Sequence, residues 1–205
     1  SVFVRKGFLS EWRKGRQMTS IDLRPILGLP GEHNHQNACA AYGVCRSIGM
    51  APKAIEEALY SYVGLPHRCQ ILGKYNGVTF VNDSKATNAD AAEKALLSFS
   101  NVRWIVGGEA KSGGISSLEP YFSRMKKAYL IGSSMTAFAE QLHHIDYVKC
   151  ETISNAVRLA IDDAEVGDVI LLAPACASFD QYESFEARGN DFINIVEAID
   201  NKNSN

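Results

Sequence analysis

The 205-residue chain is long enough for one large domain, or one domain and part of another, and needs no disulfide or metal for stability at this size. Its 46% hydrophobic and 21% charged residues are typical of a globular protein and exclude a disordered or collagen-like chain. With 21 basic and 23 acidic residues the formal charge is -2, so the chain lacks the basic excess of a general nucleic-acid binder. Local groups must therefore hold any anionic ligand.

The cysteine content indicates a reducing environment. There are five cysteines, an odd number, and no C-x-x-C pair, which argues against a disulfide framework or a zinc site. No apolar run approaches the ~20 residues that cross a bilayer. The first 18 residues lack the continuous apolar core of a signal peptide. We expect a soluble, cytoplasmic protein with no membrane insertion.

Residues 1 to about 30 contain short strand-like runs, with Val2, Val4, Phe8 and Leu9, followed by a loop-rich stretch. These runs predict no self-contained core. We therefore expect this segment to be the trailing edge of a domain whose front is absent from the chain.

Two helices are predicted next. The first covers residues 34–48 and ends at Gly49, and the second begins at Pro52 and stops at Gly64. Pro66 disfavours helix at the residue before it, so a boundary is expected there.

From residue 67 onward, strands alternate with helices. A hairpin over 69–83 turns at Asn76 and Gly77, which is a strong short-range signal. The remaining predicted strands are 102–108, 128–132, 147–150 and 168–174, and the predicted helices are 89–99, 118–125, 136–144, 154–164 and 188–199. Three of these strands are continuous apolar runs, as expected when helices cover both faces. The pattern predicts an α/β fold with a doubly wound, mainly parallel sheet.

Small and polar residues follow three of the predicted strands, at 82–88, 107–112 and 174–181. Ligands of such sheets bind outside the carboxyl ends of the strands. We expect these three loops to converge on one edge of the sheet.

The loop GGEAKSGG follows a strand but is not a phosphate-binding P-loop. The pattern requires glycine where Ala110 and Ile105 stand. Lys111 is then either a solvated surface lysine or a point charge that meets a carboxylate or phosphate. No G-x-G-x-x-G follows the first strand, which disfavours dinucleotide binding.

The pair His33 and His35 suggests a metal site, but i, i+2 side chains on a helix point apart, and a polar helix start is the favoured interpretation. Lys85 and Thr87, by contrast, stand before a predicted helix, where a cation, a hydroxyl and free N–H groups form an anion site. Ser178 offers a second such site. Two anion sites at one edge suit a dicarboxylate such as glutamate.

Five segments resemble, in this order, the Mur ligases: GEHNHQNACAA, LPHR, VNDSKATNADAAEKAL, GGEAK and LLAPACASFDQYESFEARG. The resemblance is to the members that add D-glutamate to UDP-N-acetylmuramoyl-L-alanine, and it covers the chain after about residue 20. NDSKATN and PACASFDQ are its most specific parts, because sibling Mur ligases and folylpolyglutamate synthetase carry different residues there.

The resemblance implies a domain assignment. Residues 1–65 would be the trailing, helical part of a central ATP-binding domain, and residues 66–205 a Rossmann-like domain that binds D-glutamate. The P-loop and the carbamylated lysine that holds magnesium in the family are absent from this sequence. We therefore expect a fragment that is inactive by itself, and no metal ligand within it.

The implied function is ATP-dependent ligation in peptidoglycan synthesis by a monomer, with ATP and Mg²⁺ required by the full-length enzyme. ATP phosphorylates the alanyl carboxylate, and the D-glutamate amine attacks the acyl phosphate. On the nucleotide side, Asn34 and Asn37 match residues around adenine. Arg68 and Asp83 match residues near the ribose and phosphates, with His67 adjacent.

On the amino-acid side, the resemblance gives Lys85 and Lys111 catalytic roles, with Lys85 beside the acyl phosphate. Thr87 and Lys111 would hold one carboxylate of D-glutamate, and Ser178 with the backbone at Phe185 would hold the other.

Two departures from the family pattern bear on this pocket. Phe179, in the substrate-binding segment, stands where the family commonly has leucine. Glu109 and Ala110 replace the usual Asp-Gly. Another Mur-ligase-like amino-acid ligase and a non-catalytic amino-acid-binding module remain alternatives, whereas a nicotinamide-dependent oxidoreductase is disfavoured by the missing glycine fingerprint.

Overall fold

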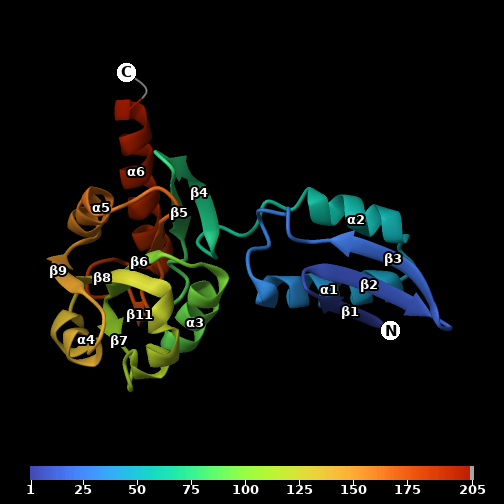
Figure 1. Cartoon of the computed structure of the whole chain (residues 1–205), viewed down its shortest axis with the longest axis horizontal. Helices are drawn as coiled ribbons and strands as arrows, with labels where there is room; N and C mark the ends of the chain where they lie inside the picture. The colour runs from blue at the N-terminus through green and yellow to red at the C-terminus, as the bar shows by residue number, and fades with distance from the viewer. Residues whose placement is uncertain (204–205) are drawn as a thin grey trace. The chain divides into compact units, whose positions relative to one another are not determined.

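A computed structural model describes residues 1–203 of the chain. The chain divides into two compact units, Ser1–Leu65 and Pro66–Asn205, which are described separately (Figure 1).

The first unit contains a three-stranded antiparallel meander followed by two helices. Its elements are β1 (Val2–Arg5), β2 (Phe8–Arg13), β3 (Arg16–Asp22), α1 (Glu32–Ser47) and α2 (Pro52–Tyr60), with strand order β1-β2-β3. Both hairpins turn on a Lys-Gly pair with positive φ at each residue, Lys6–Gly7 and Lys14–Gly15. This left-handed geometry matches the twist of paired strands.

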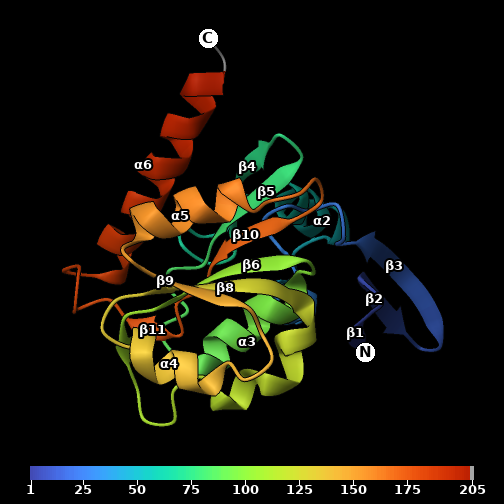
Figure 2. The same ribbon diagram turned by 60° about the vertical axis from the view of Figure 1, so that its left-hand side comes forward.

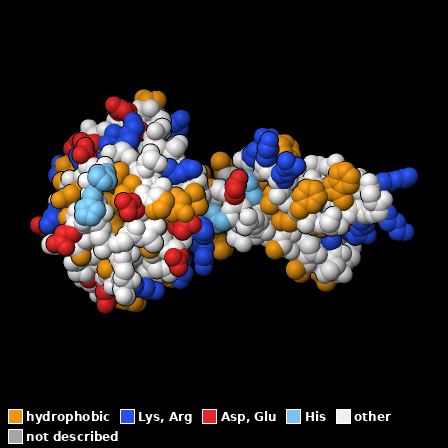
Figure 3. Space-filling view, turned by 60° about the horizontal axis from the view of Figure 1, so that its bottom comes forward, with side chains coloured by type: hydrophobic (Ala, Val, Ile, Leu, Met, Phe, Trp, Pro, Cys, Tyr) orange, Lys and Arg blue, Asp and Glu red, His pale blue; other side chains and the backbone are white. Residues whose placement is uncertain are grey.

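Residues 1 to 30 share one core with the two helices that follow them. Leu9, Ile21 and Leu23 are fully buried and pack with Tyr42 of α1 and Ile55 of α2. The description of this part as a helical remnant is incomplete, because residues 1–30 supply five of the eight buried residues of this core. The meander also carries exposed large apolar side chains, namely Phe3, Phe8, Trp12 and Met18. In Figure 3, apolar side chains lie on the surface beside lysine and arginine side chains.

The second unit is built on a six-stranded sheet with strand order β4-β5-β10-β6-β8-β9. The strands are β4 (Gln70–Tyr75), β5 (Val78–Asn82), β6 (Val102–Gly107), β8 (Met125–Ile131), β9 (Tyr147–Glu151) and β10 (Val169–Leu172). Only the β4–β5 pair is antiparallel among these neighbours, which confirms the predicted mainly parallel sheet.

Helices cover both faces of this sheet, so it is doubly wound (Figure 2). One face packs against α3 (Ala89–Ser98), the 3-10 helix η1 (Ser116–Arg124) and α4 (Met135–Gln141). The other face packs against α5 (Ile153–Asp162) and α6 (Phe185–Asn203).

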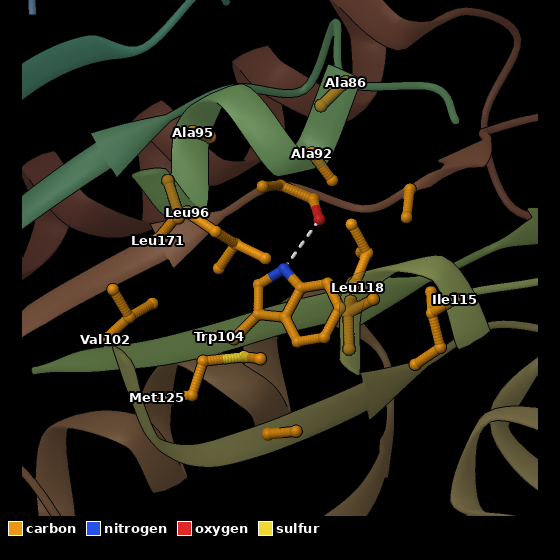
Figure 4. Packing of buried hydrophobic residues seen from close by; sticks show 14 of the residues in the cluster. Ala86, Ala92, Ala95, Leu96, Val102, Trp104, Ile115, Leu118, Met125 and Leu171 are labelled. Carbon is orange, nitrogen blue, oxygen red and sulfur yellow. Dashed lines mark hydrogen bonds between the residues drawn. The ribbon is translucent and has the colours of Figure 1, made fainter. Parts of the chain in front are cut away.

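Trp104 of β6 lies at the centre of the first of these cores (Figure 4). Its side chain is fully buried, and its indole Nε1 donates a hydrogen bond of 2.8 Å to the carbonyl oxygen of Ala173, just beyond β10. Leu96, Leu118 and Leu171 surround the ring. This bond fixes the end of β10 relative to β6, where the polar loops begin.

Candidate functional site

The three polar loops leave one edge of the sheet, because β5, β10 and β6 are parallel neighbours. The Asp83 amide donates to the Leu172 carbonyl (2.8 Å), and the Gly107 amide donates to the Pro174 carbonyl (2.9 Å). The loops after β5 and β6 are therefore each bonded to the end of β10.

Asp83 is buried at this edge. Its Oδ1 accepts a hydrogen bond from the Cys69 amide at 3.1 Å. Burial raises the pKa of Asp83 to about 6, and the exposed Arg68 guanidinium opposes this shift only weakly. A buried carboxyl with a raised pKa is typical of functional sites.

His67 lies beside Asn82, the last residue of β5, and has a positive φ of 60°. Asn82 Nδ2 lies 3.1 Å from His67 Nδ1, and since an amide nitrogen only donates, Nδ1 accepts and the proton of the neutral ring is on Nε2. Burial lowers the pKa of His67 and so favours this neutral form. A Cβ at Gly189 would lie 2.2 Å from the ring, so only glycine lets α6 approach the histidine this closely.

Lys85 and Phe185 meet between the loop after β5 and the start of α6. The ammonium of Lys85 lies 3.8 Å from the centre of the Phe185 ring, a cation–π contact that holds the lysine in place. The same ring meets His67 edge-on at 6.1 Å, and the Phe185 carbonyl accepts from Ser84 Oγ at 2.7 Å.

Arg188 ties two of the loops to α6. Its guanidinium donates to Ser84 Oγ (3.0 Å), Ser84 O (2.9 Å), Cys176 O (3.0 Å) and Ala177 O (3.2 Å). Burial lowers the pKa of Arg188 to about 10, so the group stays charged at neutral pH. Sequence reasoning missed this residue, although an arginine in the last motif, ESFEARG, was the available signal.

A two-stranded antiparallel ladder, also missed, joins β7 (Glu109–Ala110) to β11 (Cys176–Ala177). Lys111 follows β7 and is exposed, whereas Ser178 follows β11 and is buried. Phe179 is 70% exposed, so it packs little against the protein.

Several of the predicted site residues lie close together in the second unit. His67, Asp83, Lys85 and Phe185 lie together around the end of β5, with Thr87 half-buried in the same loop. The Thr87 amide donates to the Lys85 carbonyl at 2.8 Å. A common pocket for the Thr87, Lys111 and Ser178 side chains stays a prediction.

Asn34 and Asn37 lie on α1 of the first unit. Asn34 Nδ2 donates to the Pro30 carbonyl at 2.8 Å, and Asn37 is exposed. Their proposed role at adenine stays a prediction. Within residues 1–203, no group of three His, Cys, Asp or Glu side chains could hold a metal ion.

Residues 67–176 match the sequence model of the family described as "Mur ligase, glutamate ligase domain", which is more than half of the chain. The chain belongs to the Mur ligase family. The resemblance drawn from the motifs is therefore confirmed.

Curated Mur ligase relatives extend the match over nearly the whole chain. The UDP-N-acetylmuramoylalanine--D-glutamate ligase of Cereibacter sphaeroides is 60% identical over 97% of the chain. The ligase of the same name from Roseobacter denitrificans is 60% identical over 95%. The chain spans 43% and 42% of the length of these relatives.

Solved structures show the same fold at low identity. A UDP-N-acetylmuramate-alanine ligase from Thermotoga maritima matches 94% of this chain and 44% of its own with a TM-score of 0.68 and 14% identity. FolC of E. coli matches 100% of this chain and 47% of its own with a TM-score of 0.63 and 21% identity. No helix within residues 1–203 has the length and apolar character to span a bilayer.

Proposed function

We propose that this chain is the C-terminal part of a cytoplasmic, ATP-dependent ligase that joins D-glutamate to UDP-N-acetylmuramoyl-L-alanine in peptidoglycan synthesis. The observation that carries the proposal is the 60% identity, over 97% of the chain, to relatives named for this reaction. The match covers nearly the whole chain and is not confined to one motif.

The chain's own residues have positioning and electrostatic roles in this reaction. ATP supplies the phosphoryl group that activates the alanyl carboxylate. The Lys85 ammonium, held over the Phe185 ring, stabilises negative charge as the amine attacks, which is the largest usual contribution in acyl transfer. Lys111 and Thr87 bind one carboxylate of D-glutamate.

The start of α6 suits the second carboxylate. Ser184 caps this helix, since its Oγ accepts from the Ala187 amide at 3.1 Å. The first amides of a helix lack partners within it, so the Phe185 amide is available to an anion together with Ser178. We assign the exposed Arg68 and the buried Asp83 to the nucleotide, with His67 beside them. Asn34 and Asn37 are assigned to adenine. We assign no magnesium ligand to this chain.

The test is ADP release by the complete polypeptide that contains this sequence, with UDP-N-acetylmuramoyl-L-alanine and one amino acid at a time. Release that depends on D-glutamate, with L-glutamate, L-alanine and D-aspartate inert, is expected. Equal or better use of another amino acid would indicate a sibling ligase. Calorimetric binding of D-glutamate without any ADP release would indicate a non-catalytic binding module.

A further inference from the structure

The β7–β11 ladder separates the two residues assigned to the carboxylates of the amino acid. Ala110 pairs with Cys176 and Glu109 pairs with Ala177. Because the strands are antiparallel, Lys111 directly follows β7 at one end of the ladder and Ser178 directly follows β11 at the other end. The ladder therefore lies between the two carboxylate sites and contributes to the distance between them.

One turn, residues 132–134 between β8 and α4, hydrogen-bonds to the segments that flank both strands of this ladder. The Ser133 amide donates to Asp180 Oδ2 at 2.8 Å, next to Ser178 and Phe179. Ser133 Oγ donates to the Gly108 carbonyl at 3.0 Å, and the Gly108 amide donates to Ser134 Oγ at 3.2 Å. The turn therefore holds the segment before Lys111 and the segment after Ser178 at the same time.

The turn, the segment before β7 and the segment after β11 approach one another at Gly132 and Gly108, where a side chain would clash. A Cβ at Gly132 would lie 2.3 Å from Asp180 Oδ2 and 2.8 Å from the Gly108 Cα. A Cβ at Gly108 would lie 2.4 Å from the Ala177 carbonyl oxygen. Gly132 and Gly108 also have φ values of 66° and 133°, which L side chains rarely adopt.

We propose that Asp180, Ser133 and Ser134 are positioning residues that fix the spacing of Lys111 and Ser178, and that this spacing selects glutamate over aspartate. The proposal rests on the proposed function. Glutamate and aspartate differ by one methylene group. A pocket can therefore discriminate between them through the distance between its two anion sites. Such a difference is worth roughly 10-fold to 200-fold when the pocket is rigid, and little when it is loose.

Asp180 acts through the ladder and not on the substrate. Its Oδ2 is engaged by the Ser133 amide, and a carboxylate would repel an anionic ligand. The residue is exposed, so its replacement should leave the core intact. The acceptor atom, and not the charge, performs this role.

The test is steady-state kinetics of the full-length enzyme. Asp180→Ala should raise the KM for D-glutamate about 5-fold to 10-fold and leave the KM for ATP within about twofold, since the loss is one hydrogen bond. The Ki of D-aspartate as a competitive inhibitor should rise less than the KM for D-glutamate. Asp180→Asn keeps the acceptor oxygen and should restore the KM to within about twofold of wild type.

Asp162→Ala, at an exposed carboxylate on α5 that lies 3.5 Å from Arg158, is the matched control and should be neutral. An unchanged KM for D-glutamate in Asp180→Ala, an equal rise for all substrates, or an Asn variant as weak as Ala would each overturn the proposal. If Asp180→Ala does not fold, Ser134→Ala tests the same turn and should show the same selective rise. A wild-type enzyme that does not use D-glutamate refutes the proposed function instead, so the two failures are distinguishable.

Discussion

Asp83 is a buried carboxyl at the carboxyl edge, and its environment opposes its ionisation. Burial raises its pKa to about 6 from an ordinary value of 3.8. Between pH 4 and 6 the folded chain therefore keeps a proton that the unfolded chain has released. The associated stability is fully present below about pH 4 and is lost as the pH rises through 6.

We predict that Asp83→Asn flattens this dependence and makes the protein more stable than wild type at pH 7.5, by about 2 to 3 kcal/mol. The asparagine side chain still accepts from the Cys69 amide. Urea unfolding from pH 4.5 to 7.5 measures the effect, with the exposed Asp90→Asn as control. An unaltered slope in Asp83→Asn would show that this carboxyl ionises normally.

Lys85 should matter mainly when charge develops on the substrate. In the full-length enzyme, Lys85→Ala should lower kcat and kcat/KM together by roughly 100-fold or more, with a smaller change in the KM for ATP. Lys74→Ala removes an exposed lysine of the β4–β5 hairpin and should leave kcat unchanged. Near-normal turnover in Lys85→Ala would refute its catalytic role.

At the scale of elements, Arg188 joins α6 to the loop after β5 and to β11. Its guanidinium donates hydrogen bonds to four acceptor atoms, of which three are backbone carbonyl oxygens. Unmet acceptors in a buried place cost more than a hydrogen bond contributes.

We predict that Arg188→Met lowers the free energy of unfolding by about 2 to 4 kcal/mol, because the guanidinium is lost and its acceptors are left without donors. Chemical denaturation of the chain measures this. Arg158→Met, at an arginine on α5 whose side chain is 63% exposed, is the control and should change the stability by less than about 0.5 kcal/mol. Equal effects of the two substitutions would mean that the buried contacts of Arg188 do not contribute.

Local patterns predicted the elements that carry their own signals. The Asn76–Gly77 turn and the apolar strands β6, β8 and β10 are examples, and each is found near its predicted place. The Lys6–Gly7 and Lys14–Gly15 hairpins were missed because lysine is not a typical residue at positive φ. The β7–β11 ladder has two residues on each side, which is too short for any periodicity.

Site residues divide in the same way. Lys85 and Thr87 were predicted from a contiguous polar run after a strand, and Asp83 from the family resemblance. Arg188 and the Ser133–Asp180 contact depend on pairs that lie 104 and 47 residues apart, so only the folded chain reveals them.

At the scale of the whole molecule, each hydrophobic core lies entirely within one of the two units. The two tryptophans are also divided, with Trp12 in the first unit and Trp104 in the second. A unit that contains its complete cores should fold independently.

We predict that residues 66–205, expressed alone, unfold in one cooperative transition with the same denaturant midpoint as the Trp104 signal of the full chain. Trp12→Phe makes Trp104 the sole tryptophan of the full chain, and Trp12 is exposed enough to tolerate the change. A shifted midpoint in the shorter chain would show that residues 1–65 stabilise the second unit.

The place of β10 in the sheet has a consequence for biosynthesis. β10 is the last of the six strands to leave the ribosome, yet it lies between β5 and β6 and bonds to both. Until residue 172 has emerged, β5 and β6 lack the strand that joins them, and the edge of β6 that bonds to β10 remains without its partner. Closure of the sheet is therefore a late event, and nascent chains that stall before β10 expose aggregation-prone strand edges that chaperones must protect.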